Sequence, residues 1–103
     1  MTYPQRRLEK MVNSDSDYDR EVAASADNLT ESDMLGLALD NNWQIRLALA
    51  KNNEITIATI TELVYDTTTE VRIAIASHHK LPEDLKEILL KDEKEKVRDA
   101  IKR

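Results

Sequence analysis

Residues 66–76 of the chain read Asp66-Thr67-Thr68-Thr69-Glu70-Val71-Arg72-Ile73-Ala74-Ile75-Ala76, an acidic and hydroxyl-rich turn followed by an apolar run with one arginine. Val71, Ala74 and Ile75 are spaced i, i+3 and i+4, which places them on one face of an α-helix. A turn with Asp and Thr before such a run is typical of a helix start. The stretch therefore predicts a short amphipathic helix that begins just after Asp66.

The same pattern recurs along the chain at intervals of 26 residues. Arginine fills the equivalent position in each copy: Arg20, Arg46, Arg72 and Arg98. An apolar position is kept in the same way: Met11, Leu37, Leu63 and Leu89. Self-similarity at a fixed period is the signature of a repeat protein. We therefore expect a single domain over residues 1–103, made of repeats at about 1–26, 27–52, 53–78 and 79–103.

Each copy also predicts an earlier helix. Its start is marked by residues that favour the first positions of a helix: Pro4, Thr30, Thr56 and Pro82. Apolar residues with helical spacing follow, as Ile60, Leu63 and Val64 show in the third copy. Helices of roughly ten residues are not stable alone in water, so neighbouring copies must stack to bury these faces. We therefore expect an all-α fold, an α-solenoid of paired short helices.

Two segments carry a resemblance to known repeats. Residues 66–76 and 92–101 resemble the aspartate-to-valine-arginine segment of HEAT and HEAT-like repeats, and the short period and the passage 76–82 are closer to the leucine-rich repeat variant. The resemblance covers all four copies and is weakest in the first, where Ser14 takes the Asp position and Asp19 the Val position. Together with the four 26-residue, two-helix repeats, it implies a right-handed superhelix, a fold used mainly as a protein-binding scaffold, with rarer members that hold nucleic acid. It implies no particular reaction.

Composition and charge narrow the class of partner. Apolar residues make up 41% of the chain and charged residues 34%, with no Cys and a net charge of −5. A chain without Cys needs no oxidising compartment, and a negative net charge disfavours nonspecific attraction to nucleic acid or anionic lipid. No apolar stretch resembles a leader or approaches the ~18 residues of a membrane span. We expect a cytoplasmic protein, a monomer or weak oligomer, that does not bind membranes.

No set of residues indicates an enzyme or a metal centre. Gly36 is the only glycine, so no glycine-rich phosphate loop is present, and no nucleophile with an adjacent base can be assigned. His78 and His79 are adjacent, which on a helix directs their rings about 100° apart, whereas ligands on one helical face need i, i+3 or i+4 spacing. We expect no catalytic residue, no cofactor and no metal.

The arginine column has two interpretations. Four guanidinium groups at one repeat spacing could follow a nucleic-acid backbone. Alternatively they pair with acids, since Asp40, Asp66 and Asp92 each lie six residues before an arginine, at the turn into its helix. Such carboxylates can accept charge-assisted hydrogen bonds within or between repeats. We favour the structural interpretation of this ladder.

The second helices of the middle repeats offer a candidate binding face. If the i, i+3 and i+4 positions face the core, Leu47 and Ile73 point nearly the opposite way, and Trp43 lies one turn before Leu47. Glu70 and Glu54 add acidic neighbours. The column reads, along the chain: Glu21, Leu47, Ile73 and Asp99. An apolar patch bounded by acids is typical of a binding surface, with Trp43 as its anchor; alternatively, the first helices of adjacent repeats cover this column.

The sequence thus favours a small non-enzymatic protein-binding module, an adaptor or inhibitor that uses the outward face of the second helices. Binding of a nucleic-acid backbone through the arginine column is one alternative. In another, the acidic middle of the chain mimics such a backbone and occupies a nucleic-acid-binding partner.

Overall fold

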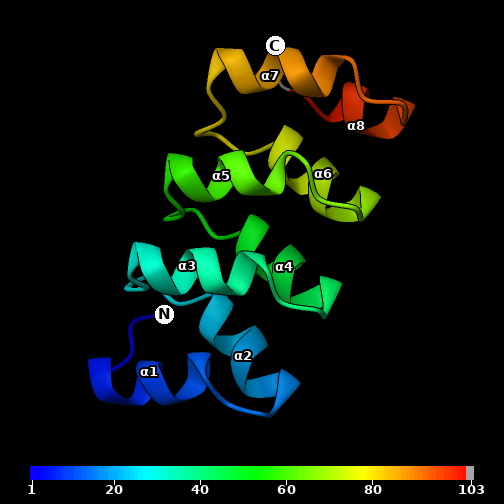
Figure 1. Ribbon diagram of the computed structural model, residues 1–103. Coiled ribbons are helices and arrows are strands. Elements are labelled where there is room, and N and C mark those ends of the chain that lie inside the picture. Colours follow the sequence, from blue (N-terminus) through cyan, green and yellow to red (C-terminus); the bar gives the residue numbers. More distant parts are fainter. Residues whose placement is uncertain (102–103) are drawn as a thin grey trace.

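A computed structural model describes residues 1–101, and within them it contains eight α-helices and no strand (Figure 1). The helices are α1 (Gln5–Val12), α2 (Asp17–Ala24), α3 (Glu31–Ala38), α4 (Trp43–Ala50), α5 (Ile57–Leu63), α6 (Thr69–Ala76), α7 (Glu83–Leu90) and α8 (Glu95–Ala100). Consecutive odd-numbered helices begin 26 residues apart, and so do consecutive even-numbered helices. The all-α prediction is therefore confirmed.

Local hydrogen bonds explain where the helices start. Each odd-numbered helix has as its N-cap a residue of the predicted start column: Pro4, Thr30, Thr56 and Pro82. The hydroxyl of Thr30 accepts from the Asp33 N–H at 3.1 Å, which satisfies one of the amides that a helix start leaves unpaired. Before α4, α6 and α8 an aspartate orders the turn; Asp66 Oδ1, for example, accepts from the Thr68 N–H at 2.9 Å. Before α2, Ser14 Oγ accepts from the Ser16 N–H at 3.0 Å.

The helices stack into an elongated molecule of 40 × 21 × 18 Å. Odd-numbered helices lie above one another in one layer and even-numbered helices in a second layer (Figure 1). The two helices of each pair, α1–α2, α3–α4, α5–α6 and α7–α8, pack against each other. Neighbouring pairs contact through α2 with α4, α4 with α6 and α6 with α8, so the even-numbered helices form a continuous row. These neighbour contacts are consistent with a helical repeat.

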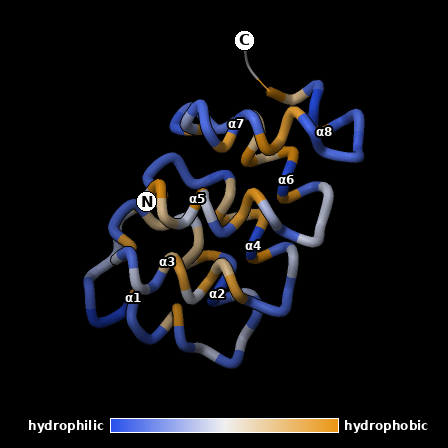
Figure 2. Tube along the Cα trace, turned by 45° about the horizontal axis from the view of Figure 1, so that its top comes forward, coloured by the Kyte–Doolittle hydropathy of each residue, from blue (hydrophilic) through white to orange (hydrophobic). Residues whose placement is uncertain are grey.

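The core is aliphatic and runs along the whole stack. Apolar segments gather in the helices at its centre and hydrophilic residues in the loops at its edges (Figure 2). In α5 the predicted apolar face, Ile60, Leu63 and Val64, is fully buried. In α7 the position equivalent to Ile60 is Lys86, whose Nζ bonds Glu83 at 3.0 Å, so this end of the stack is polar. Among residues 1–101, no helix has both the length and the apolar character needed to cross a bilayer.

Candidate functional site

Three hollows lie side by side on the row of even-numbered helices. The hollow between α4 and α6 has a volume of about 530 Å³, and the one between α2 and α4 about 450 Å³. A third, of about 340 Å³, lies between α2 and the first residues of the chain. The first two share Leu47 and Lys51 as lining residues, and the last two share Glu21 and Ser25. The three hollows therefore follow one another across α2, α4 and α6, and together we call them the trough.

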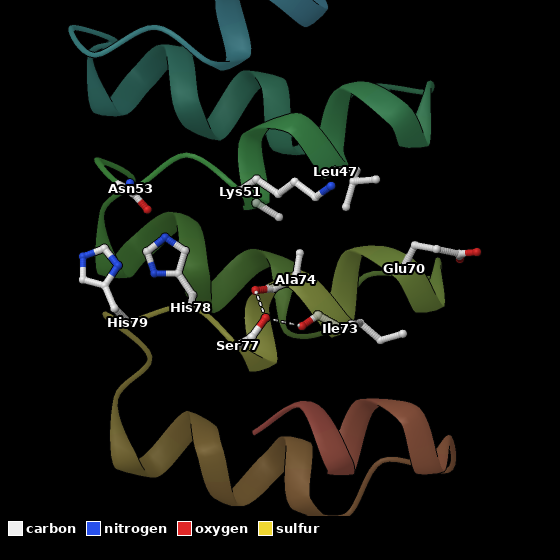
Figure 3. Close-up of a pocket in the computed structure, with 10 residues that line it drawn as sticks. Leu47, Lys51, Asn53, Glu70, Ile73, Ala74, Ser77, His78 and His79 are labelled. Carbon is white, nitrogen blue, oxygen red and sulfur yellow. Dashed lines mark hydrogen bonds between the residues drawn. The ribbon is translucent and has the colours of Figure 1, made fainter. Parts of the chain in front are cut away.

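The predicted anchor residues line this trough. Leu47 of α4 and Ile73 of α6 line the α4–α6 hollow from its two helices (Figure 3). Both are half-buried and pack against the core, so they are neither turned wholly outward nor covered by the first helices. Trp43 is 39% exposed and lines the α2–α4 hollow together with Leu47. An aromatic and two aliphatic side chains are thus accessible in one trough.

The two acids of the predicted surface are separated. Glu70 lines the α4–α6 hollow, at the opposite end from His78 and His79 (Figure 3). Glu54 lies instead in a smaller hollow of about 230 Å³, together with Asp27 and Asn52. Glu54 therefore lines a different hollow from Leu47 and Ile73, one that adjoins theirs through Lys51 and Asn53.

The arginine column forms a ladder between helix pairs. Each Nε donates to a carboxylate of the following pair: Arg20 to Asp40 at 2.8 Å, Arg46 to Asp66 at 2.8 Å and Arg72 to Asp92 at 2.7 Å. Each Nη1 donates to a backbone carbonyl six residues earlier: Ser14 at 2.7 Å, Asp40 at 2.6 Å and Asp66 at 2.7 Å. Arg98 donates in the same way to the Asp92 carbonyl. Each arginine therefore binds its own loop through the backbone, and Arg20, Arg46 and Arg72 also bind the next loop through a carboxylate.

The ladder is shielded from solvent. The side chains of Arg46 and Asp66 are 13% and 5% exposed. Burial alone would raise the pKa of Asp40. That pKa is nevertheless below its ordinary value, because the carboxylate accepts hydrogen bonds from Arg20 and from the Asn42 N–H and lies near the positive charges of Arg20 and Arg46. Burial would likewise raise the pKa of Asp92, but hydrogen bonds from Arg72 and the Lys94 N–H lower it. These groups are engaged with one another rather than presented to a ligand.

A second ladder, which sequence reasoning missed, joins the loops after the even-numbered helices. The buried Asn52 side chain donates from Nδ2 to the carbonyls of Ala24 at 2.8 Å and Ala26 at 2.9 Å. One pair further, His78 Nε2 lies 2.9 Å from the Asn52 carbonyl. Asn52 and His78 are 26 residues apart, so the repeat register was the signal that could have identified them.

The hydrogen bonds define the charge state of His78. Its Nδ1 accepts from the Lys80 N–H at 3.1 Å, so the ring proton is on Nε2, which donates to the Asn52 carbonyl. Burial, together with the nearby His79 and Lys80, lowers the pKa of His78 despite the bond to Asn52. The His79 ring stacks on it with centroids 4.9 Å apart. His78 is thus a neutral structural residue at one end of the trough.

The trough offers apolar contact, hydrogen bonds and a few charges, which are the means of noncovalent binding. Within the part of the chain that the structure describes, no three His, Cys, Asp or Glu residues are grouped to hold a metal ion. Comparisons of the chain with protein-family models, curated proteins and solved structures find no match.

Proposed function

We propose that the chain is a small non-enzymatic protein-binding module, an adaptor or inhibitor, which holds its partner in the trough across α2, α4 and α6. The observation that carries the proposal is the accessible set of Trp43, Leu47 and Ile73 in joined hollows. Tryptophan and aliphatic side chains in a pocket are typical anchors of protein interfaces, because they bury much apolar area at little entropic cost. The chain has no Cys and needs no oxidising compartment, so we place this activity in the cytoplasm.

We further propose that the chain is a right-handed α-solenoid of four 26-residue repeats, related to HEAT-like repeats and the leucine-rich repeat variant. The equal spacing of the helix starts supports this architecture. So does the ladder, which repeats the same Arg–Asp bond at successive helix pairs. Solenoids of this kind bind partners along an extended surface, which agrees with a trough that crosses several helices.

The ladder weighs against both alternatives. A phosphate backbone binds cationic side chains that are free to displace its condensed counterions. Arg20, Arg46 and Arg72 are instead held by carboxylates of the protein itself. The same pairing neutralises the aspartates at positions 40, 66 and 92, so a mimic of a phosphate backbone would have to rely on other acids of the chain. A protein partner in the trough requires neither set of groups.

The proposal is tested by removing the anchor. We expect Trp43→Ala to reduce capture of bound proteins from a cell extract at least about ten-fold, with the helical circular dichroism unchanged. Tyr65→Ala is the matched control, since Tyr65 is an exposed aromatic residue at the end of α5, outside the trough. If Trp43→Ala and Tyr65→Ala retain the same partners in the same amounts, the trough is not the binding site.

A further inference from the structure

We propose the chemistry of the partner, an inference that rests on the proposed function. The partner presents an extended segment with the order basic, apolar, apolar, basic, in which each of these four residues lies three positions after the one before it. The row that carries it lies on successive even-numbered helices and reads Glu21, Leu47, Ile73 and Asp99. Glu21 and Asp99 are exposed, whereas Leu47 and Ile73 are half-buried. A segment that crosses this row meets a carboxylate, two apolar surfaces and a second carboxylate.

The charge of the trough favours basic flanks. Glu21 and Glu70 line it, and neither forms an ion pair within residues 1–101. Glu70 lies beside Ile73 and adds to the acidic end of the row. Lys51 is the one Lys or Arg side chain lining the α2–α4 and α4–α6 hollows. Two carboxylates that flank an apolar centre complement Lys or Arg on either side of a partner's apolar residues.

The spacing of the partner's residues follows from the stacking of the helices. Packed helices lie about 8–10 Å apart. An extended segment in the polyproline II conformation rises about 3.1 Å per residue with three residues per turn, so its side chains three residues apart project on the same side. Each step from one even-numbered helix to the next therefore corresponds to about three residues of the partner. The matching segment spans about ten residues, with the basic residues at its first and last positions and the apolar residues between them.

Polar side chains of the trough favour an extended partner over a helical one. Ser25, Gln44, Lys51 and Asn53 line the hollows, and in the described part of the chain their side chains make no hydrogen bond. An extended segment has backbone N–H and C=O groups that need partners, whereas a helix satisfies its own. Lys51 in this arrangement donates to a carbonyl of the partner and keeps its positive charge, which the carboxylates of Glu21 and Glu70 outnumber.

The test is a selection of displayed random peptides of about twelve residues, long enough to cross the trough when extended. We expect enriched peptides to carry Lys or Arg on both sides of two apolar residues at three-residue spacing. Their affinity is then measured by the fluorescence anisotropy of dye-labelled peptides, a readout that also works in a variant without Trp43, the only tryptophan of the chain. Glu21→Lys with Asp99→Lys, which reverses the two carboxylates at the ends of the row, should weaken binding about ten-fold or more. Glu62→Lys with Glu87→Lys, the same charge change at exposed positions of α5 and α7, should leave it unchanged.

The outcomes separate this inference from the proposed function. Enriched peptides with acidic flanks, with no pattern, or with apolar residues seven apart as in a helix would overturn the inference. So would equal losses in the two charge-reversed variants. If such peptides still lose affinity on Trp43→Ala, the proposed function stands and only the partner's chemistry is wrong. If no selected peptide depends on Trp43, both proposals fail.

Discussion

Arg46 Nε donates to Asp66 Oδ2 at 2.8 Å, across twenty residues of chain and from one helix pair to the next. The same guanidinium donates from Nη1 to the Asp40 carbonyl at 2.6 Å, so one side chain holds two successive loops at a fixed separation. Because both members of the ion pair are shielded from water, each depends on the other to compensate its lost hydration.

Arg46→Met should lower the free energy of unfolding by about 3 kcal/mol, since it leaves the Asp66 carboxylate buried without its partner. Urea denaturation followed by circular dichroism measures the change. Glu83→Gln removes one member of the Lys86–Glu83 pair, in which Glu83 is 84% exposed, and should cost less than about 0.5 kcal/mol. Equal losses in the two variants would show that shielding does not determine the contribution of the ladder.

Asn52→Ala should cost about 2 kcal/mol, because it removes three side-chain hydrogen bonds, one of them from the Glu54 N–H, and leaves the Ala24 and Ala26 carbonyls unpaired in a buried site. Thermal unfolding reports the loss as a lower Tm. The neighbouring variant Asn53→Ala, at an exposed position, serves as the control and should leave the Tm nearly unchanged. A small effect at position 52 would indicate that water replaces the side chain.

The stability of the fold should fall as the pH decreases through the range below the ordinary pKa of histidine, about 6.5. The pKa of His78 is lowered in the folded chain, so the unfolded state binds the proton more readily. The contribution of neutral His78 is therefore complete above about pH 6.5 and is lost as the pH falls toward its folded-state pKa. Denaturant unfolding at several pH values between about 5 and 8 measures this slope.

Two variants test whether His78 is the residue that makes the free energy of unfolding depend on pH. His78→Asn places at position 78 the side chain that position 52 already uses, and it should flatten the slope while the chain stays folded. His79→Asn changes an exposed ring and should retain the slope of the wild type. A slope that persists in His78→Asn would place the titrating group elsewhere.

Gly36→Ala should stabilise the protein by about 0.5–1 kcal/mol, because glycine within a helix loses more backbone entropy on folding than alanine does. Gly36 lies inside α3 at an exposed position, and a Cβ added there meets no atom within 4 Å. The urea midpoint should rise with an unchanged slope. A decrease would mean that α3 needs the flexibility of glycine.

Those features of the fold that depend on nearby residues could be predicted from the sequence. Thr30 and Thr56 mark helix starts because an N-cap hydroxyl bonds an amide only three residues away. The apolar faces follow from helical spacing alone, as Ile60, Leu63 and Val64 show. The 26-residue period then sets the alternation of the helices.

Features that depend on the stacking could be predicted only in part. The acid nearest to Arg46 in the sequence is Asp40, six residues before it, yet that residue offers its backbone carbonyl, whereas the carboxylate comes from Asp66. Asn52 resembles a turn residue until the next helix pair covers it. The half-buried state of Leu47 depends on the separation and angle between α4 and α6, which no period in the sequence specifies.

The direction of the Arg–Asp bonds makes the length of this protein adjustable. Each of the two middle helix pairs gives its arginine to the pair that follows and its aspartate to the pair that precedes it. A second copy of residues 53–78, inserted after position 78, adds one ladder aspartate and one ladder arginine. Its aspartate meets Arg72 and its arginine meets Asp92, so the chain can grow in increments of 26 residues without an unmatched charge at either new junction.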